Sequence, residues 1–337
     1  MRIVFFGSPD YAVPSLRACL ALPGAEVVAV VTQPDRPRGR SGRALATPVK
    51  QLALEAGIPT ILQPDKPRRD TTEALAALDP DVGVVAAYGN ILPTHLLEAF
   101  PHDLLNVHAS LLPRHRGAAP VAAAILAGDA ETGATIMKVV RELDAGPILD
   151  AVRTPIDPLD TAGALTDRIA TLGATLLAGL LPRWLAGEIE PIEQDETLSS
   201  YAPRLTKADG VIDWTDPADH IARLVRAFHP WPTTTTTYAG HPLTIHEAWP
   251  LPDLPTSAPP GTVLPPNVLP NPIEDLTPLL PGRRPRALVA CGHGALALLR
   301  IQRPGKQPTD IEPYLNGDPT LIGSHLGTRP QPRTLEA

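Results

Sequence analysis

The first half of the 337-residue chain alternates short apolar runs with longer segments of helical pattern. The runs at residues 3–6, 27–32 and 82–87 have the length of strands, and the last is apolar throughout. A continuous apolar run is typical of a strand that is buried on both faces of a sheet. Strands that alternate with helices predict a parallel sheet with crossover helices, so the sequence indicates an α/β fold.

Further elements complete this first domain, which we expect to span residues 1–188. Helices are predicted at 14–22, 49–56, 118–127 and 162–187, and strands at 104–107 and 134–140. After the first strand stands Gly7-Ser8-Pro9-Asp10, where a dinucleotide-binding fold would carry Gly-x-Gly-x-x-Gly. The sheet is therefore Rossmann-like, but the sequence supports neither nicotinamide nor ATP binding.

The second half has a different character. A linker is expected at residues 189–205, followed by a small β-rich domain at 206–330. Its predicted elements are a helix at 217–228 and strands at 233–238, 243–248, 288–290 and 295–301. Between residues 250 and 285, 12 of 36 residues are proline, which predicts an exposed insertion without regular helix or sheet.

The charge balance restricts the function classes. The net charge is −7; residues 1–203 hold 17 basic and 24 acidic residues, and the remainder holds 12 of each. Neither half is the basic domain of a general nucleic-acid binder, so any such contact must come from local patches. One patch consists of Arg36, Arg38, Arg40 and Arg43.

Cysteine content and apolar segments bear on the compartment. Cys19 and Cys291 are far apart and predict neither a disulfide framework nor a zinc site. The first apolar run is too short for a signal peptide, and no segment is expected to have the length of a membrane span. We expect a soluble cytoplasmic protein.

The candidate site begins at the strand predicted for residues 104–107. Asn106 and His108 are two residues apart, so on a strand their side chains share a face, at its carboxyl end. Open α/β sheets bind their ligands at that end. Asp144 is the candidate third member, because an amide, a histidine and a carboxylate can stabilise an oxyanion and handle one proton. On its own, Asn-x-His also fits a strand-end turn with no catalytic role.

Sequence motifs along most of the chain resemble the methionyl-tRNA formyltransferases, within the wider folate-dependent formyltransferase group. The motifs are residues 6–10 (FGSPD), 32–37 (TQPDRP), 87–93 (AYGNILP), 110–120 (SLLPRHRGAAP), 128–137, 143–146 (LDAG), 212–214 (IDW) and 226–232 (RAFHPWP). The motif at 110–120 indicates the wider group. The two-domain layout and the loop at 33–50 narrow it to the tRNA enzymes.

The resemblance implies a Rossmann-like catalytic domain and a C-terminal β-barrel of the oligonucleotide-binding type. It implies 10-formyltetrahydrofolate as formyl donor, initiator methionyl-tRNA as acceptor, no metal, and a monomer. Asn106, His108 and Asp144 would be catalytic, with Asn106 and His108 donating to the oxyanion and Asp144 orienting His108 and taking the proton of the amine. The residues that would contact folate are Ser110, Leu111, Leu112 and Pro113, and those that would contact tRNA are Arg36, Arg38, Arg40 and Arg43.

Two departures and several alternatives remain open. The family loop usually reads Gly-Arg-Gly, whereas this chain has Gly39-Arg40-Ser41-Gly42-Arg43, and the proline-rich insertion is unusually long. His115 is expected to be a loop residue near substrate, while Arg114 and Arg116 fit either anion contacts or a solvated loop. Other functions to weigh are glycinamide ribonucleotide formyl transfer, the hydrolase domain of a larger folate enzyme, and a non-enzymatic RNA-binding or chaperone-like protein on this scaffold.

Overall fold

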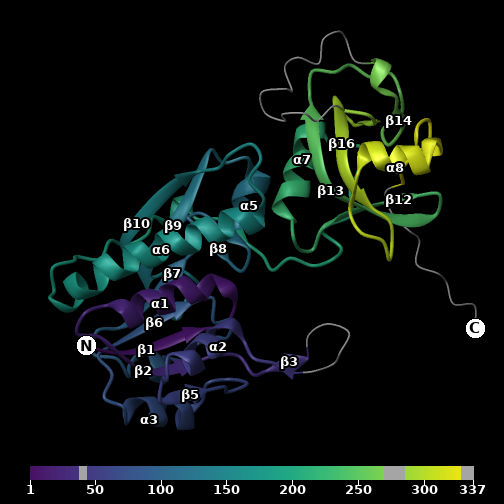
Figure 1. The fold of residues 1–337 in the computed structure, drawn as a ribbon. Coiled ribbons are helices and arrows are strands. Elements are labelled where there is room, and N and C mark those ends of the chain that lie inside the picture. The colour runs from purple at the N-terminus through teal and green to yellow at the C-terminus, as the bar shows by residue number, and fades with distance from the viewer. Residues whose placement is uncertain (38–43, 269–284, 328–337) are drawn as a thin grey trace, which may run out of the picture. The chain divides into compact units, whose positions relative to one another are not determined.

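The computed structural model describes residues 1–37, 44–268 and 285–327 (Figure 1). The chain forms two compact units. The first comprises Met1–Ala124, Ala130–Asp157 and Ala164–Arg204, and the second comprises Ile125–Asp129, Pro158–Gly163 and the residues after Arg204. The division at residues 188 and 206 stays a prediction, although the first unit extends through most of the expected linker.

A seven-stranded sheet forms the centre of the first unit, in the order β10-β9-β7-β6-β1-β2-β5. Its strands are β1 (Arg2–Gly7), β2 (Glu26–Val31), β5 (Thr60–Leu62), β6 (Val82–Ala86), β7 (Leu104–His108), β9 (Glu131–Lys138) and β10 (Ile148–Pro155). The five strands from β7 to β5 are parallel, as predicted, but β9 runs antiparallel to both of its neighbours. The expectation of a wholly parallel sheet is wrong on this side: β9 runs against β7 although a helix at Pro120–Ala127 lies between them in the chain, and β10 runs against β9, to which a loop joins it.

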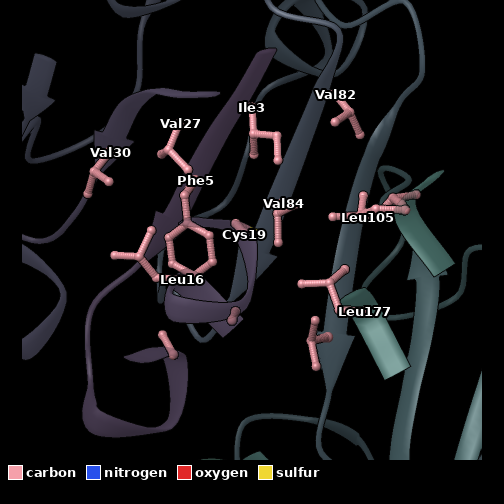
Figure 2. Close-up of a cluster of buried hydrophobic side chains, with 14 of the residues drawn as sticks. Ile3, Phe5, Leu16, Cys19, Val27, Val30, Val82, Val84, Leu105 and Leu177 are labelled. Carbon is pink, nitrogen blue, oxygen red and sulfur yellow. The ribbon is translucent and has the colours of Figure 1, made fainter. Parts of the chain in front are cut away.

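Alternate residues of β1 enter different cores, which explains why the run at 3–6 is apolar throughout. Ile3 and Phe5 pack in one cluster with α1 (Val13–Ala21), α2 (Pro48–Glu55) and α6 (Ala162–Leu185), as Figure 2 shows for part of it. Val4 and Phe6 pack on the other face with α3 (Arg69–Ala76) and α4 (Thr94–Leu97). Helices therefore cover both faces of the sheet, and only its ends are open to ligands.

By length and composition alone, helix α6 is long enough and apolar enough to cross a membrane. The expectation that no segment has this length is wrong. In the structure, its residues Leu177, Leu180 and Leu181 are buried against the sheet. A β-carbon at Gly173 would lie 2.8 Å from Val107 and 3.1 Å from Ala134, so glycine allows the helix to approach β7 and β9 closely. Such packing is that of a core helix.

The second unit is an antiparallel sheet in the order β12-β13-β16-β15-β14, with β17 beside β16. Its strands are β12 (Thr234–Tyr238), β13 (His241–Leu251), β14 (Val263–Leu264), β15 (Leu288–Ala290), β16 (Ala295–Gln302) and β17 (Thr309–Asp310), and its helices are α7 (Ala218–Ala227) and α8 (Ile311–Gly317). The fully buried Trp214 lies in its core and donates from Nε1 to Thr236 Oγ1 over 3.0 Å.

Residues 323–327 connect the two edges of this curled sheet. Gly327 exchanges backbone hydrogen bonds with Thr237 of β12, and Val263 of β14 exchanges them with Gly323 and Ser324. Both edge strands are thereby paired, which is how a barrel avoids exposed edges. The second domain is thus a β-barrel of the oligonucleotide-binding type.

The proline-rich stretch contains more regular structure than the sequence predicted. Strand β13 continues to Leu251, and Val263 is fully buried where β14 pairs with β15. The expectation of no regular sheet over residues 250–285 is therefore wrong for 250–251 and 263–264. Residues 269–284 lie outside the described residues.

The remaining short elements are β3 (Arg36–Pro37), β4 (Ala44–Leu45), β8 (Arg116–Gly117), β11 (Tyr201–Ala202) and α5 (Pro120–Ala127). The pair β8–β11 is parallel and joins the loop after β7 to the segment that follows α6.

Candidate active site

Strand β7 ends in the candidate site and brings three polar side chains together. Asn106 Nδ2 lies 3.4 Å from Asp144 Oδ1, and His108 Nδ1 lies 3.7 Å from Asp144 Oδ2. The two residues of β7 thus reach one carboxylate from the same face of the strand, as their spacing predicted. His108 is 6% exposed and the Asp144 side chain 12%, so these polar groups interact largely out of water.

Asp144 lies in the loop between β9 and β10, in an unusual backbone conformation. Its φ is +51°, a region that costs a residue with a side chain about 1–3 kcal/mol unless neighbours hold it there. The Gly117 N–H donates to its Oδ2 over 2.8 Å. Two residues on, a β-carbon at Gly146 would lie 1.9 Å from the Lys138 carbonyl oxygen, so only glycine fits. The loop is held in a shape that turns the carboxylate towards β7.

The second ring nitrogen of His108 contacts the backbone of the following loop. Nε2 lies 3.0 Å from the carbonyl oxygen of His115. Because a carbonyl can only accept, the hydrogen of this bond belongs to Nε2. The sequence directed attention to the His115 side chain, whereas it is the His115 backbone that contacts His108. Its own N–H donates to Ser200 Oγ over 2.9 Å.

The segment expected to contact folate is fixed by one threonine of β9. Thr135 Oγ1 donates to the Ser110 carbonyl over 2.7 Å and accepts from the Leu112 N–H over 3.2 Å. Ser110 and Thr135 are fully buried. The Leu111 side chain lies over Gly133, where a β-carbon would come within 2.8 Å of it. The backbone of residues 110–113 is therefore held firmly beside His108.

Arg116 is directed into the protein. Its Nε and Nη2 donate to Gln194 Oε1 over 3.1 and 2.8 Å, and its Nη1 and Nη2 donate to Glu196 over 2.9 and 2.8 Å. The Arg116 guanidinium lowers the pKa of the Glu196 carboxyl below its ordinary value. Arg116 is therefore paired with residues of the segment after α6, and the anion contact expected as one of its two roles stays a prediction. No pattern in the sequence pointed to Gln194.

The expected tRNA-contacting loop is described only at its ends. Arg36 is exposed in β3, which pairs with β4, while Arg38, Arg40 and Arg43 lie outside the described residues. At the base of this loop, Lys50 Nζ donates to Asp35 Oδ2 and to Gln63 Oε1, both over 2.7 Å. The hydrogen bond from Lys50, and after it the one that Gln63 Nε2 donates to Asp35 Oδ1, lower the pKa of the Asp35 carboxyl. Both ends of the loop are thus tied together.

The described residues contain no group of three histidine, cysteine or acidic side chains that could hold a metal ion. Two N–H donors, from Asn106 and His108, lie beside a carboxylate that can accept a proton. Such a set is suited to acyl transfer from a neutral donor to an amine.

Known proteins resemble this chain in sequence over both of its units. Residues 1–181 match the family model described as formyl transferase, and residues 204–269 match the formyl transferase C-terminal domain. Methionyl-tRNA formyltransferase of Methylococcus capsulatus is 44% identical over 97% of this chain and 100% of its own length. The protein of the same name from Roseiflexus sp. (strain RS-1) is 44% identical over 97% of this chain and 95% of its own length.

A solved structure also shares the fold. The N-formyltransferase from Helicobacter canadensis, in complex with folinic acid and dTDP-3-aminofucose, superposes with a TM-score of 0.62 at 17% identity. The match covers 88% of this chain and 98% of that one.

Proposed function

The chain belongs to the formyl transferase family, and from that membership we infer that it is a methionyl-tRNA formyltransferase acting in translation initiation. It transfers the formyl group of 10-formyltetrahydrofolate to the amino group of methionine on initiator methionyl-tRNA. The observation that carries this function is the 44% identity to methionyl-tRNA formyltransferases over nearly the whole of both chains. The cluster of Asn106, His108 and Asp144 supports a direct transfer without a covalent enzyme intermediate.

In the first step, the methionyl amine attacks the formyl carbon and the carbonyl oxygen becomes an oxyanion. His108 donates to this oxyanion from Nε2, whose single hydrogen leaves the His115 carbonyl as the oxyanion forms, because the charged oxygen is the stronger acceptor. Asn106 adds a second donor from the same strand face. Removal of one such donor typically raises the barrier by about 2.7–4 kcal/mol.

In the second step, the attacking nitrogen loses a proton and the bond between the formyl carbon and N10 of the folate breaks. The Asp144 carboxylate accepts the proton of the attacking nitrogen, directly or through a water molecule, and returns it to the leaving N10 as the oxyanion collapses to the carbonyl. Because Asp144 lies 3.7 Å from His108 Nδ1, its charge also favours the orientation of the imidazole that the first step needs. The proton lost by the methionyl amine is thus matched by the proton gained at N10.

Two further segments bind the substrates in this proposal. Residues Ser110 to Pro113 contact the folate, supported by their rigid attachment to Thr135 beside His108. The loop that carries Arg36, Arg38, Arg40 and Arg43 contacts the phosphates of the tRNA acceptor end. The anchoring of that loop through Asp35 and Lys50 supports a defined position for its base. We propose that the enzyme works as a cytoplasmic monomer without membrane contact.

A formylation assay with 10-formyltetrahydrofolate tests the proposal, with charged initiator methionyl-tRNA and glycinamide ribonucleotide offered in parallel. We expect formyl-methionyl-tRNA from the wild type and a loss of at least about 100-fold in kcat for His108→Ala. Transfer only to glycinamide ribonucleotide would keep the chemistry and change the acceptor. Binding of tRNA with no transfer to either acceptor would instead support a non-enzymatic RNA-binding protein.

A further inference from the structure

The segment after α6 returns to the candidate active site and joins its loops. Ile192 exchanges backbone hydrogen bonds with Ile148 of β10, over 2.7 and 2.8 Å. Further on, the Ser200 carbonyl accepts from the Arg116 N–H over 2.8 Å, and the Ala202 carbonyl accepts from the Ala118 N–H over 2.9 Å. Residues 192–202 thus lie along both the loop after β7 and the start of β10.

Gln194 stands at the centre of this segment, and its side-chain amide uses its full bonding capacity. Nε2 donates to the Asp144 carbonyl over 2.8 Å and to the Gly146 carbonyl over 2.7 Å. Oε1 accepts two bonds from the Arg116 guanidinium. Because carbonyls require a donor and a guanidinium requires an acceptor, only one orientation of the amide fits.

The two carbonyls that Gln194 binds are the carbonyl of Asp144 itself, whose carboxylate faces β7, and that of Gly146, two residues further along the same loop. Asp144 has a φ of +51°, so its conformation depends on contacts that hold the loop. Gln194 holds the main chain of Asp144, while the Gly117 N–H, next to Arg116, holds its carboxylate. The Gln194 amide therefore contacts both the main chain of Asp144 and Arg116, the neighbour of the residue that binds the Asp144 carboxylate.

We propose that Gln194 is a positioning residue for formyl transfer, which sets the place of the Asp144 carboxylate relative to His108 and Asn106. The proposal rests on the proposed function of this site. Gln194 touches no reacting atom; it acts through the Asp144 loop and through Arg116. Gln194, although it lies in the segment predicted as a linker between domains, in this way supports the carboxylate of the site.

The test compares steady-state kinetics of Gln194→Glu, Gln194→Met and wild type. Gln194→Glu keeps the acceptor for Arg116 but sets a carboxylate oxygen against two carbonyls, whereas Gln194→Met removes all four bonds without adding a charge. A displacement of a catalytic group by about 1 Å can cost about 100-fold in rate, so we expect kcat to fall at least about tenfold in both. The KM values for tRNA and folate should change by less than about twofold, because no substrate contact is lost.

Asp195→Ala is the matched control. Its carboxylate accepts from the N–H and the hydroxyl of Thr197, so the change loosens the same segment without touching the Asp144 loop. We expect its kcat to equal that of the wild type.

A second comparison places Gln194→Glu in the Asp144→Ala background. If Gln194 acts through Asp144, the added change lowers the residual kcat by less than about twofold. Equal losses in both backgrounds, unchanged kcat in the folded single variants, or failure of both variants to fold would each overturn the proposal. Wild-type formylation is measured in the same series, so an incorrect function would be recognised separately.

Discussion

Replacement of Thr135 by valine should separate the support of the folate segment from the chemistry of the site. The side chain keeps its shape, but the Ser110 carbonyl loses its donor and the Leu112 N–H loses its acceptor, both in buried surroundings. A buried polar group left without a partner costs about 1–3 kcal/mol, so the two together should lower the free energy of unfolding by about 2–6 kcal/mol. Each kcal/mol shifts the Tm of a domain of this size by about 2–4 °C.

Calorimetry measures the shift, and two controls identify its cause. Thr135→Ser keeps the hydroxyl and should retain most of the stability. Thr132→Val makes the same change on the same strand, where the hydroxyl is buried and has no hydrogen-bond partner among the described residues, so the variant should be as stable as the wild type or more so.

Kinetics provide the second measurement on Thr135→Val. If residues 110–113 contact folate, the KM for 10-formyltetrahydrofolate should rise by a larger factor than the KM for tRNA. A Thr135→Val protein with the Tm of the wild type would refute the reasoning about the two buried groups. A lowered Tm with unchanged folate KM would refute the folate role of the segment.

Three further changes test other parts of the structure. Gly146→Ala should abolish formylation, because the added β-carbon would lie 1.9 Å from a backbone oxygen and displace the Asp144 loop. Circular dichroism should show that the variant is folded, and a near-normal kcat would contradict the displacement of the loop. Burial raises the pKa of Cys19 and Cys291 to about 12, so neither thiol should react with a maleimide at pH 8 until the protein is denatured. Rapid labelling of the native protein would show that the two thiols are not buried. The Asp35 pKa is lowered from 3.8, so the stability that its carboxylate contributes is complete above that value and is lost as pH falls through the folded pKa. The difference in unfolding free energy between wild type and Asp35→Asn should therefore shrink below about pH 4. A difference that stays constant with pH would exclude the Lys50 interaction as its source.

The sequence predicted the part of the fold that depends on local pattern. The runs at 3–6, 27–32 and 82–87 are strands because residues on both of their faces are buried, and such runs are visible without knowledge of the fold. Strand β10 was missed: its sequence ILDAVRTP mixes buried and exposed residues at the edge of the sheet. The direction of β9 could not be predicted from local pattern either. A strand's direction depends on how it is connected to its neighbours, and its own residues do not show this.

In the candidate site, the polar side chains could be predicted from the sequence, but the contacts that hold them in place could not. Asn106 and His108 came from period-two spacing on one strand, and Asp144 came from the chemistry that a carboxylate would add to them, with the resemblance to a family as support. The contact of His108 with the His115 carbonyl involves a backbone atom, which carries no sequence signal. Gln194 is 50 residues from Asp144 in a polar segment, and only the folded chain brings the two together.

Closure of the second domain by residues 323–327 has a consequence for biosynthesis. The sheet of the first unit is complete at Pro155 and the unit itself at Arg204, so it can fold while translation of the second continues. The barrel has no such opportunity, because Thr237 and Val263 gain their last backbone partners only when residues 323–327 have been made. Until then, these two strand edges are open to other nascent chains, and a ribosome that stalls after codon 302, when β16 has been made, and before codon 323 would leave them unpaired for as long as it pauses.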